Sequence, residues 1–252
     1  MSSEQSRPAH EGVVPLPPAG TPDAPDDASA VLRADGLGMR THVGWVFRHV
    51  DLRADAGEVV EVRGSGGTGR SMLLLTLAGR ARPSVGTLRV LGHDLPRGSR
   101  AVRRRSAVAR LDRVIGPEEH HTVRMTFRER ARWERVHPPG SDGLGYRVDE
   151  VRELTGLVAD PDVHVEGLPA VQRTLLAVAL AALPRPELLV LDDLDDGLPP
   201  DEQALVWEAL TRVADADGCV VLASTAGDPR TPAPDDPPRT VLELHPTHVE
   251  ES

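Results

Sequence analysis

The sequence predicts an α/β fold with a mostly parallel sheet at its centre, and three observations support this class. In the second half of the chain, short apolar runs that suit buried strands alternate with amphipathic or apolar helical segments. Earlier, VVEVR at 59–63 enters the glycine-rich loop GSGGTGRS at 64–71, and a helical pattern follows at 71–80. The chain has 252 residues, 39% of them hydrophobic, which is enough to bury a large core.

The other elements follow from local patterns. Residues 1–28 are rich in Pro, Ser, Ala and Asp and predict a disordered tail. Before the loop, VLRADGL at 31–37 predicts an edge strand and 45–54 a second strand; after it, GTLRVLGHDL at 86–95 predicts a hairpin. Further on, the patterns predict helices at 148–157, 171–183 and 200–216, buried strands at 187–193 and 219–225, and a last strand at 240–244.

Composition restricts the functional classes. The net charge of −10 argues against a nucleic-acid binder, which normally presents a basic face. The single cysteine, Cys219, excludes an internal disulfide and fits a reducing cytoplasm; we expect it in the core. No apolar run is long enough to span a bilayer, so we expect any membrane association to come through a partner. His120 and His121 have no third ligand at metal spacing, so no zinc site is predicted.

Arginine is distributed unevenly. All 29 basic residues are arginine, and residues 97–135 hold twelve of them against five acids. One interpretation is a docking surface for an acidic protein segment or for anionic lipid; the other is an ordinary solvated surface in a lysine-free chain.

The loop is the first candidate site. Its glycines permit positive φ and close backbone approach, so its N–H groups and the start of the following helix can hold a phosphate. The candidate binding residues are Gly64, Ser65, Gly66, Gly67, Thr68, Gly69, Arg70 and Ser71. Arg70 stands where such loops carry lysine, and the Ser71 hydroxyl is a candidate ligand of Mg²⁺. The alternative is a plain glycine turn.

The second candidate site is Asp192, which follows the apolar run ELLVL. An acid at the end of a buried strand suits a magnesium site, although core strands also end in solvated acids. We expect the acids beyond it, Asp193, Asp195 and Asp196, to form a solvated loop.

Longer stretches carry a family resemblance. GLPAVQRTLLAVALAALPRPELLVLDDLDDGLPP and HHTVRMTFRER, with intervals of 24 residues from Leu168 to Asp192 and 34 from Asp192 to Ala226, resemble the nucleotide-binding domain of ATP-binding-cassette (ABC) transporters. The resemblance covers about 31–244. It implies a P-loop NTPase of ABC type with an antiparallel β subdomain and a helical subdomain (roughly 100–180) within a domain at 29–245, followed by a short tail at 246–252.

The same resemblance implies a function. The expected ligands are ATP and Mg²⁺, and the expected partners are a membrane permease and a second cassette subunit, the same or different. The chain would then lie in the cytoplasm, peripheral to the inner face of the cell membrane. An unrelated P-loop NTPase is the remaining fold-level alternative.

Several positions depart from the family pattern. Arg70 replaces the loop lysine, and Arg113 falls at the glutamine that helps to hold Mg²⁺. The adenine-stacking aromatic falls near Thr41, where His42 or Trp45 could substitute, and we expect Trp45 in the core. Further replacements are Pro169-Ala170-Val171 for the signature Ser-Gly-Gly, Asp193 for the catalytic glutamate, Pro199 for the D-loop aspartate and Ala226 for the switch histidine. We therefore expect weak or lost hydrolysis, with Asp193 the candidate catalytic residue. The alternative is a non-hydrolysing regulatory or scaffold subunit.

Overall fold

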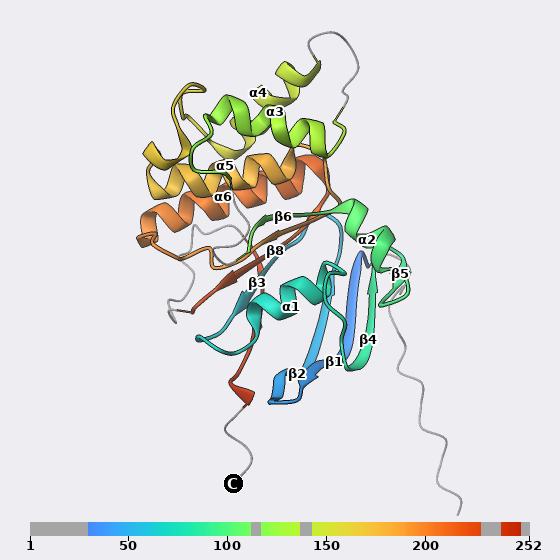
Figure 1. Cartoon of the computed structure of the whole chain (residues 1–252). Helices are drawn as coiled ribbons and strands as arrows, with labels where there is room; N and C mark the ends of the chain where they lie inside the picture. The colour runs from blue at the N-terminus through green and yellow to red at the C-terminus, as the bar shows by residue number, and fades with distance from the viewer. Residues whose placement is uncertain (1–29, 112–116, 137–142, 228–237, 248–252) are drawn as a thin grey trace, which may run out of the picture.

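The computed structural model describes residues 30–111, 117–136, 143–227 and 238–247. The predicted tail at 1–28 and Arg113 lie outside these residues. Two sheets and two groups of helices make up the described fold (Figure 1).

The first sheet is antiparallel. It contains β1 (Leu32–Thr41), β2 (Gly44–Ala54), β4 (Val85–Val90) and β5 (His93–Asp94) in the order β2-β1-β4-β5. The expected hairpin at 86–95 is confirmed as β4–β5. The expectation that 31–37 forms an edge strand is wrong, because β1 pairs with β2 on one side and β4 on the other.

The second sheet is parallel throughout. It contains β3 (Val59–Arg63), β6 (Ser106–Arg110), β7 (Leu188–Leu191), β8 (Val220–Thr225) and β9 (Thr240–Glu243) in the order β6-β7-β8-β3-β9. Every residue of β7 and β8 is buried. Both faces are covered, as a parallel sheet requires: Leu189 and Leu191 enter one apolar cluster, while Leu188 and Val190 enter the other.

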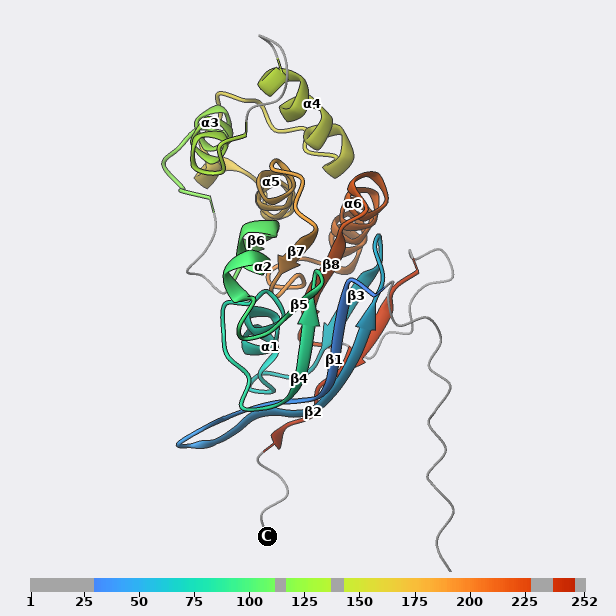
Figure 2. The same ribbon diagram turned by 90° about the vertical axis from the view of Figure 1, so that its right-hand side faces the viewer.

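Helices separate onto the two faces of the parallel sheet. Figure 2 shows α1 (Arg70–Leu77) and the antiparallel sheet on one side, and α5 (Ala170–Ala182) and α6 (Pro200–Asp217) on the other. Beyond α5 lie α3 (Val123–Trp133) and α4 (Gly143–Thr155), while the short α2 (Ser99–Arg105) lies beside β5 and β6. A short 3₁₀ turn at Val165–Gly167 precedes α5.

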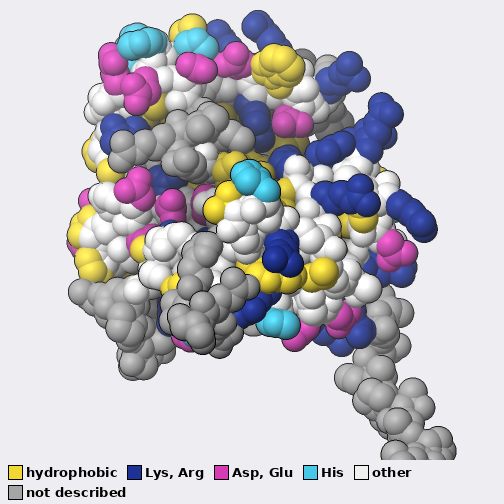
Figure 3. Space-filling view, turned by 60° about the horizontal axis from the view of Figure 1, so that its bottom comes forward, with side chains coloured by type: hydrophobic (Ala, Val, Ile, Leu, Met, Phe, Trp, Pro, Cys, Tyr) yellow, Lys and Arg dark blue, Asp and Glu magenta, His cyan; other side chains and the backbone are white. Residues whose placement is uncertain are grey.

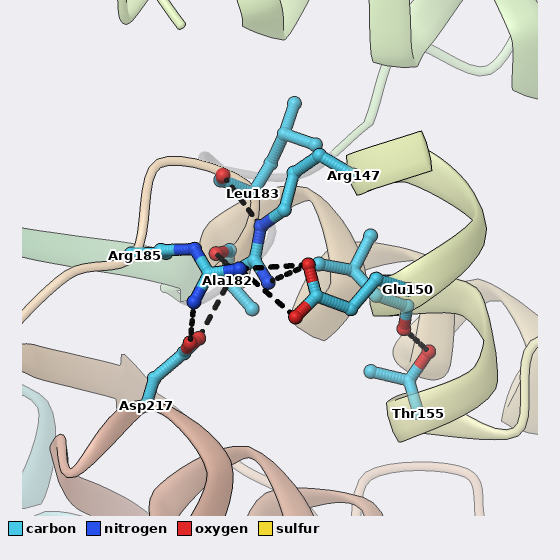
Figure 4. Close-up of polar contacts among 8 residues, drawn as sticks. Arg147, Glu150, Thr155, Ala182, Leu183, Arg185 and Asp217 are labelled. Atoms are coloured by element: carbon cyan, nitrogen blue, oxygen red, sulfur yellow. Dashed lines mark hydrogen bonds and ion pairs between the residues drawn. The ribbon is translucent and has the colours of Figure 1, made fainter. Parts of the chain in front are cut away.

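The helices α3 to α6, called the helical lobe below, are held together in part by a buried arginine. Arg147 on α4 is 3% exposed and donates to the carbonyl oxygens of Ala182 and Leu183 at the end of α5, at 2.6 and 3.2 Å (Figure 4). The same guanidinium donates to Asp217 at the end of α6, at 3.0 Å, and lies 2.8 Å from Glu150. One side chain thus connects three helix ends.

The arginine-rich segment forms three elements that the sequence analysis did not assign. They are α2, β6 and α3, and β6 belongs to the parallel sheet although it falls inside the range expected for the helical subdomain. Basic side chains gather along the right-hand side of the face in Figure 3, the side on which Figure 1 places α2. Arg100, Arg103 and Arg104 of α2 are exposed.

Candidate functional site

The glycine-rich loop connects β3 to α1 and is open toward solvent. Gly66 and Gly67 are exposed, and a Cβ added to either would meet no atom within 4 Å. Gly69 caps α1 with φ 88°, and a Cβ there would lie 2.4 Å from the carbonyl oxygen of Val46, so only glycine fits. Within the described part of the chain, the N–H groups of Gly66, Gly67 and Gly69 donate to no acceptor. These donors at a helix start form an anion-binding concavity.

Two contacts hold the loop from inside. The Thr68 hydroxyl, in a side chain that is 1% exposed, donates to the carbonyl oxygen of Ser65 at 2.8 Å and closes the turn. The N–H of Gly64 donates to the carbonyl oxygen of Thr225 at 3.2 Å, which connects the loop to the end of β8. The loop conformation is therefore fixed by the parallel sheet.

Arg70, the first residue of α1, does not point freely into the loop. Its Nη2 donates to Asp193 Oδ1 at 2.7 Å, and its side chain is 11% exposed. The other terminal nitrogen, Nη1, is buried without a hydrogen-bond partner in the described structure. The ion pair leaves this donor of the guanidinium unused.

Asp192 directly follows β7 and is fully buried. One carboxylate oxygen, Oδ1, accepts from the hydroxyl of Ser224 on β8, while Oδ2 has no hydrogen-bond partner in the described structure. A buried carboxylate with an unused oxygen is costly unless another group binds it. Carboxylate oxygen is a ligand that Mg²⁺ prefers, directly or through water.

Asp193 is held on its backbone as well as its side chain. Its N–H donates to Ser224 Oγ at 2.9 Å, and its carbonyl oxygen accepts from Arg110 Nη2. The residue has φ 45°, a left-handed conformation that is uncommon outside glycine but that aspartate and asparagine adopt more often than most residues. The expectation of a solvated loop is therefore wrong for Asp193, whereas Asp196 is exposed as expected.

Burial and the neighbouring charges shift the pKa of the Asp193 carboxyl group in both directions. Burial raises the pKa of Asp193 above its ordinary value, and the neighbouring Asp192 raises it further, while Arg70 and Arg110 lower it. Burial also lowers the pKa of Arg110, against the opposing effect of the acids at 192–196. The site thus concentrates opposite charges in a partly desolvated space.

Arg110 and Ser224 are functional candidates that the sequence analysis missed. Arg110, the last residue of β6, donates to the carbonyl oxygen of Asp192 at 3.3 Å and to Thr174 Oγ1 on α5 at 3.1 Å. The Ser224 hydroxyl contacts both acids at the end of β7. The available signals were weak: a basic residue at the end of an unassigned strand, and a hydroxyl two residues before Ala226.

The remaining predicted residues are more scattered. His42 is exposed in the turn between β1 and β2, and Trp45 is half-buried, with the Arg40 guanidinium 5.6 Å from its ring centroid. Pro169 caps α5, and the N–H of Ala226 donates to Asp195 at 2.9 Å. The Ser71 hydroxyl is bonded to no group in the described residues. The structure brings Arg70, Asp192 and Asp193 together, but places His42 on a separate hairpin.

These groups fit the ligands that the sequence predicts. The loop offers unused N–H donors, Arg70 offers an unused Nη1, and Asp192 offers an unused oxygen. Donors of this kind hold phosphate, and the carboxylate and the Ser71 hydroxyl would hold Mg²⁺. When bound, Mg²⁺ neutralises phosphate charge.

Comparison with known proteins decides the family. The family model described as ABC transporter matches residues 47–195, which contain the loop, Arg110 and the aspartate pair. The chain belongs to the ABC transporter family. Among solved structures, cbiO1 from Clostridium perfringens, part of the ABC transporter complex cbiONQ, superposes with a TM-score of 0.65 over 79% of both chains at 19% identity. A bacterial ABC transporter cassette solved as a dimer gives 0.64 over 78% of this chain and 88% of its own, at 16% identity.

Curated relatives of this ABC protein align over part of their own length. A putative ABC transporter ATP-binding protein of Methanopyrus kandleri is 35% identical over 59% of this chain and 54% of its own. A daunorubicin resistance ATP-binding protein of Streptomyces coeruleorubidus is 29% identical over 79% of this chain and 61% of its own. A probable anion import ATP-binding protein of Haloferax volcanii is 30% identical over 77% and 71%, respectively. The chain thus spans little more than half of the first two relatives.

Other predicted features remain structural in character. Cys219 is fully buried, and burial raises its pKa to about 12, as expected for a core thiol. No group of three or more metal-ligating side chains occurs among the described residues. Nor does any helix in the described ranges have the length and hydropathy needed to cross a membrane.

Proposed function

We propose that this chain is the ATP-binding subunit of an ABC transporter and binds ATP with Mg²⁺ to drive or regulate a membrane permease. Two observations together carry the proposal: the open loop has unused N–H donors, and the buried Asp192 has one carboxylate oxygen without a hydrogen-bond partner. Family membership and the cassette fold of the solved structures support it. In this proposal Gly64–Ser71 hold the phosphates and Asp192 holds the metal.

The proposal includes weak or absent hydrolysis by this site. Asp193, the candidate base, is ion-paired with Arg70 at 2.7 Å and held on its backbone by Arg110 and Ser224. A general base must reach the water it activates, and this carboxylate is already engaged. Ala226 has no imidazole at the switch position, and Pro169 has no N–H to donate at the signature loop.

The permease would dock where α3, α5 and β6 meet. A pocket of about 230 Å³ lies there, with an apolar wall that includes Val108 and Leu180 and a rim that includes Glu129 and Arg130. Trp133 beside it is 79% exposed. An exposed aromatic at a pocket rim suits a protein interface. The protein would then act in the cytoplasm at the inner face of the membrane, with a second cassette subunit as further partner.

The test is calorimetric titration of the full chain with MgATP, followed by an assay of phosphate release. We expect saturable binding that Arg70→Ala weakens by at least tenfold, because one charge-assisted contact to phosphate contributes about 1.5–3 kcal/mol. We expect phosphate release no faster than that of Asp193→Asn. No binding at millimolar MgATP would overturn nucleotide binding, and turnover that depends on Asp193 would overturn the loss of hydrolysis.

A second candidate is a regulatory or scaffold subunit that keeps the cassette fold without hydrolysis. The internal Arg70–Asp193 pair favours it, because an arginine that is ion-paired within the protein has part of its charge compensated without a ligand. Co-purification with the permease separates the two functions. A scaffold binds equally with and without nucleotide, whereas a nucleotide-driven subunit changes its affinity for the permease when ATP is added.

A further inference from the structure

We propose that Asp193 is an internal competitor of the nucleotide for Arg70, so that this carboxylate sets the nucleotide affinity of the loop. The inference rests on the proposed function, since it concerns the same site. It assigns Asp193 a role in binding that is separate from any role in hydrolysis.

The competition follows from the geometry of Arg70. Its guanidinium is the cation that α1 places at the loop, and one edge already donates to Asp193 at 2.7 Å. Carboxylate and phosphate oxygens use the same donors of an arginine, and both bind them in charge-assisted hydrogen bonds. A phosphate that binds both terminal nitrogens therefore competes with Asp193 for Nη2, while one that binds only the unused Nη1 makes a single contact.

The backbone of Asp193 is fixed in a position from which its carboxylate competes with phosphate for Arg70. Its N–H donates to Ser224 Oγ at 2.9 Å and its carbonyl oxygen accepts from Arg110, so its backbone is fixed on both sides. The cost of ordering the side chain is thus lower than for a mobile surface acid. The ion pair is also only partly exposed, with 11% of the Arg70 side chain and 34% of the Asp193 side chain accessible, so solvent screens it less than a surface pair.

The neighbouring acids offer a matched control. Asp196 is exposed, and its side chain forms no hydrogen bond or ion pair in the described structure, although its N–H donates to the carbonyl oxygen of Asp193 at 3.0 Å. Its carboxylate nevertheless lies close enough to act on the charge of Arg110. Asp196→Asn removes the same negative charge from the same loop without touching Arg70. Any general gain in affinity from lower negative charge appears in this variant too.

The experiment measures the dissociation constants of ADP and of a non-hydrolysable ATP analogue, both with Mg²⁺, by calorimetry on the full chain. We expect Asp193→Asn to bind about tenfold tighter than the natural chain, since the phosphate gains a charge-assisted contact without competition. Asparagine also tolerates the positive φ at this position, so the variant should fold. Asp196→Asn should change affinity by less than about twofold, as expected for an exposed, screened charge.

A double variant separates the ion pair from the charge. In an Arg70→Ala background, Asp193→Asn should no longer raise affinity, because the competing cation is gone. Equal affinities for the natural chain and Asp193→Asn, or an equal gain in the Arg70→Ala background, would overturn the inference and leave nucleotide binding intact. Absence of binding in every variant, including Asp193→Asn, would overturn both. Asp193→Gly, which also suits the positive φ, serves as the second variant with the same expected direction.

Discussion

Two arginines in this protein are buried beside carboxylates, and they differ in how many partners surround the guanidinium. Arg147 in the helical lobe donates to two carbonyl oxygens and to Asp217, and its Nη1, which forms no hydrogen bond, lies 2.8 Å from the Glu150 carboxylate (Figure 4). Arg70 at the glycine loop donates to one carboxylate and leaves Nη1 without a partner. The first arginine holds helix ends together; the second has capacity for a ligand.

The difference indicates how buried charged groups in this fold can be interpreted. A buried charge that is surrounded by opposite charges and acceptors stabilises a packing arrangement, whereas one with fewer partners costs free energy until something binds it. By this criterion the Arg147 cluster, with Asp217, Glu150 and two carbonyl oxygens around one guanidinium, is structural. The Arg70, Asp192 and Asp193 group is the candidate binding site.

The largest expected effect concerns the helical lobe. We expect Arg147→Met to lower the free energy of unfolding by about 3–5 kcal/mol, because it leaves Asp217 buried with less compensation. Urea denaturation measures it. Arg185→Gln is the matched control: it also contacts Asp217 and Glu150, but its side chain is 56% exposed, so its loss should cost about 1 kcal/mol or less. Equal effects of both variants would remove the distinction between the buried and exposed arginines.

Glu61 on β3 extends the comparison, because it is a buried carboxylate that accepts several hydrogen bonds. It accepts hydrogen bonds from Arg63, Arg239 and Thr225. We expect Glu61→Gln to cost about 2 kcal/mol of unfolding free energy, as for hydrogen bonds to a charged group. Glu243→Gln on the exposed edge strand β9 should change stability by less than about 0.5 kcal/mol.

The same residue predicts a pH dependence with a definite sign. Burial alone would raise the pKa of Glu61, but the hydrogen bonds from Arg63, Arg239 and Thr225 outweigh it and leave the pKa below the ordinary 4.5. A lowered pKa in the folded state adds stability above about pH 4.5, and this is lost as the pH falls through the folded-state value. Denaturation curves of the natural chain and Glu61→Gln should therefore converge below pH 4.5. A difference between them that stays constant with pH would contradict this.

Asp192→Asn should change the free energy of unfolding in the opposite direction. Removing a buried charge with an unused oxygen should leave stability unchanged or raise it by about 1 kcal/mol, because the desolvation cost falls. At the same time, nucleotide affinity should lose its dependence on Mg²⁺, measured by titrating ATP with magnesium and with chelator. Asp196→Asn should keep the full magnesium effect. A large loss of stability in Asp192→Asn would place this residue with Arg147 as a structural group.

The smallest effect is expected at Cys219. Its thiol is fully buried and burial raises its pKa to about 12, so the native protein should not react with a thiol reagent at pH 8. Reaction should begin only in denaturant. Rapid labelling of the native chain would show that this end of β8 opens readily.

Much of the fold was predictable from local pattern. The buried strands and the helices α4 to α6 were predicted near their observed positions, because apolar period and flanking turns agree there. The segment from 99 to 133 was not assigned, because its many arginines obscure the period of α2 and α3. The role of β1 as an interior strand depends on its pairing with β4. Even the pair nearest in sequence, Gly38 with Val85, joins residues 47 positions apart, and no local pattern encodes that pairing.

The site was predictable only in part. The loop and Asp192 follow from motif spacing, but spacing contains no information on where a side chain points. Arg70 meets Asp193 across 123 positions in sequence, and Arg110 reaches the same residue from a strand that the sequence did not reveal. These contacts depend on the order of strands in the sheet, which only the folded chain determines.

The position of β3 in the sheet has a consequence for how the protein is made. Its two neighbours, β8 and β9, are the last of the described strands, and the registered pairs Val59–Val221 and Val60–Thr240 join residues 162 and 180 positions apart. Translation must therefore pass residue 221 before β3 can pair. Until then the strand that leads into the glycine loop has two open edges, and Gly64 lacks its acceptor on Thr225. Contacts this distant in sequence form slowly and expose apolar strands to aggregation. We therefore expect the loop to be among the last parts of the protein to mature, and truncation before β8 to abolish it.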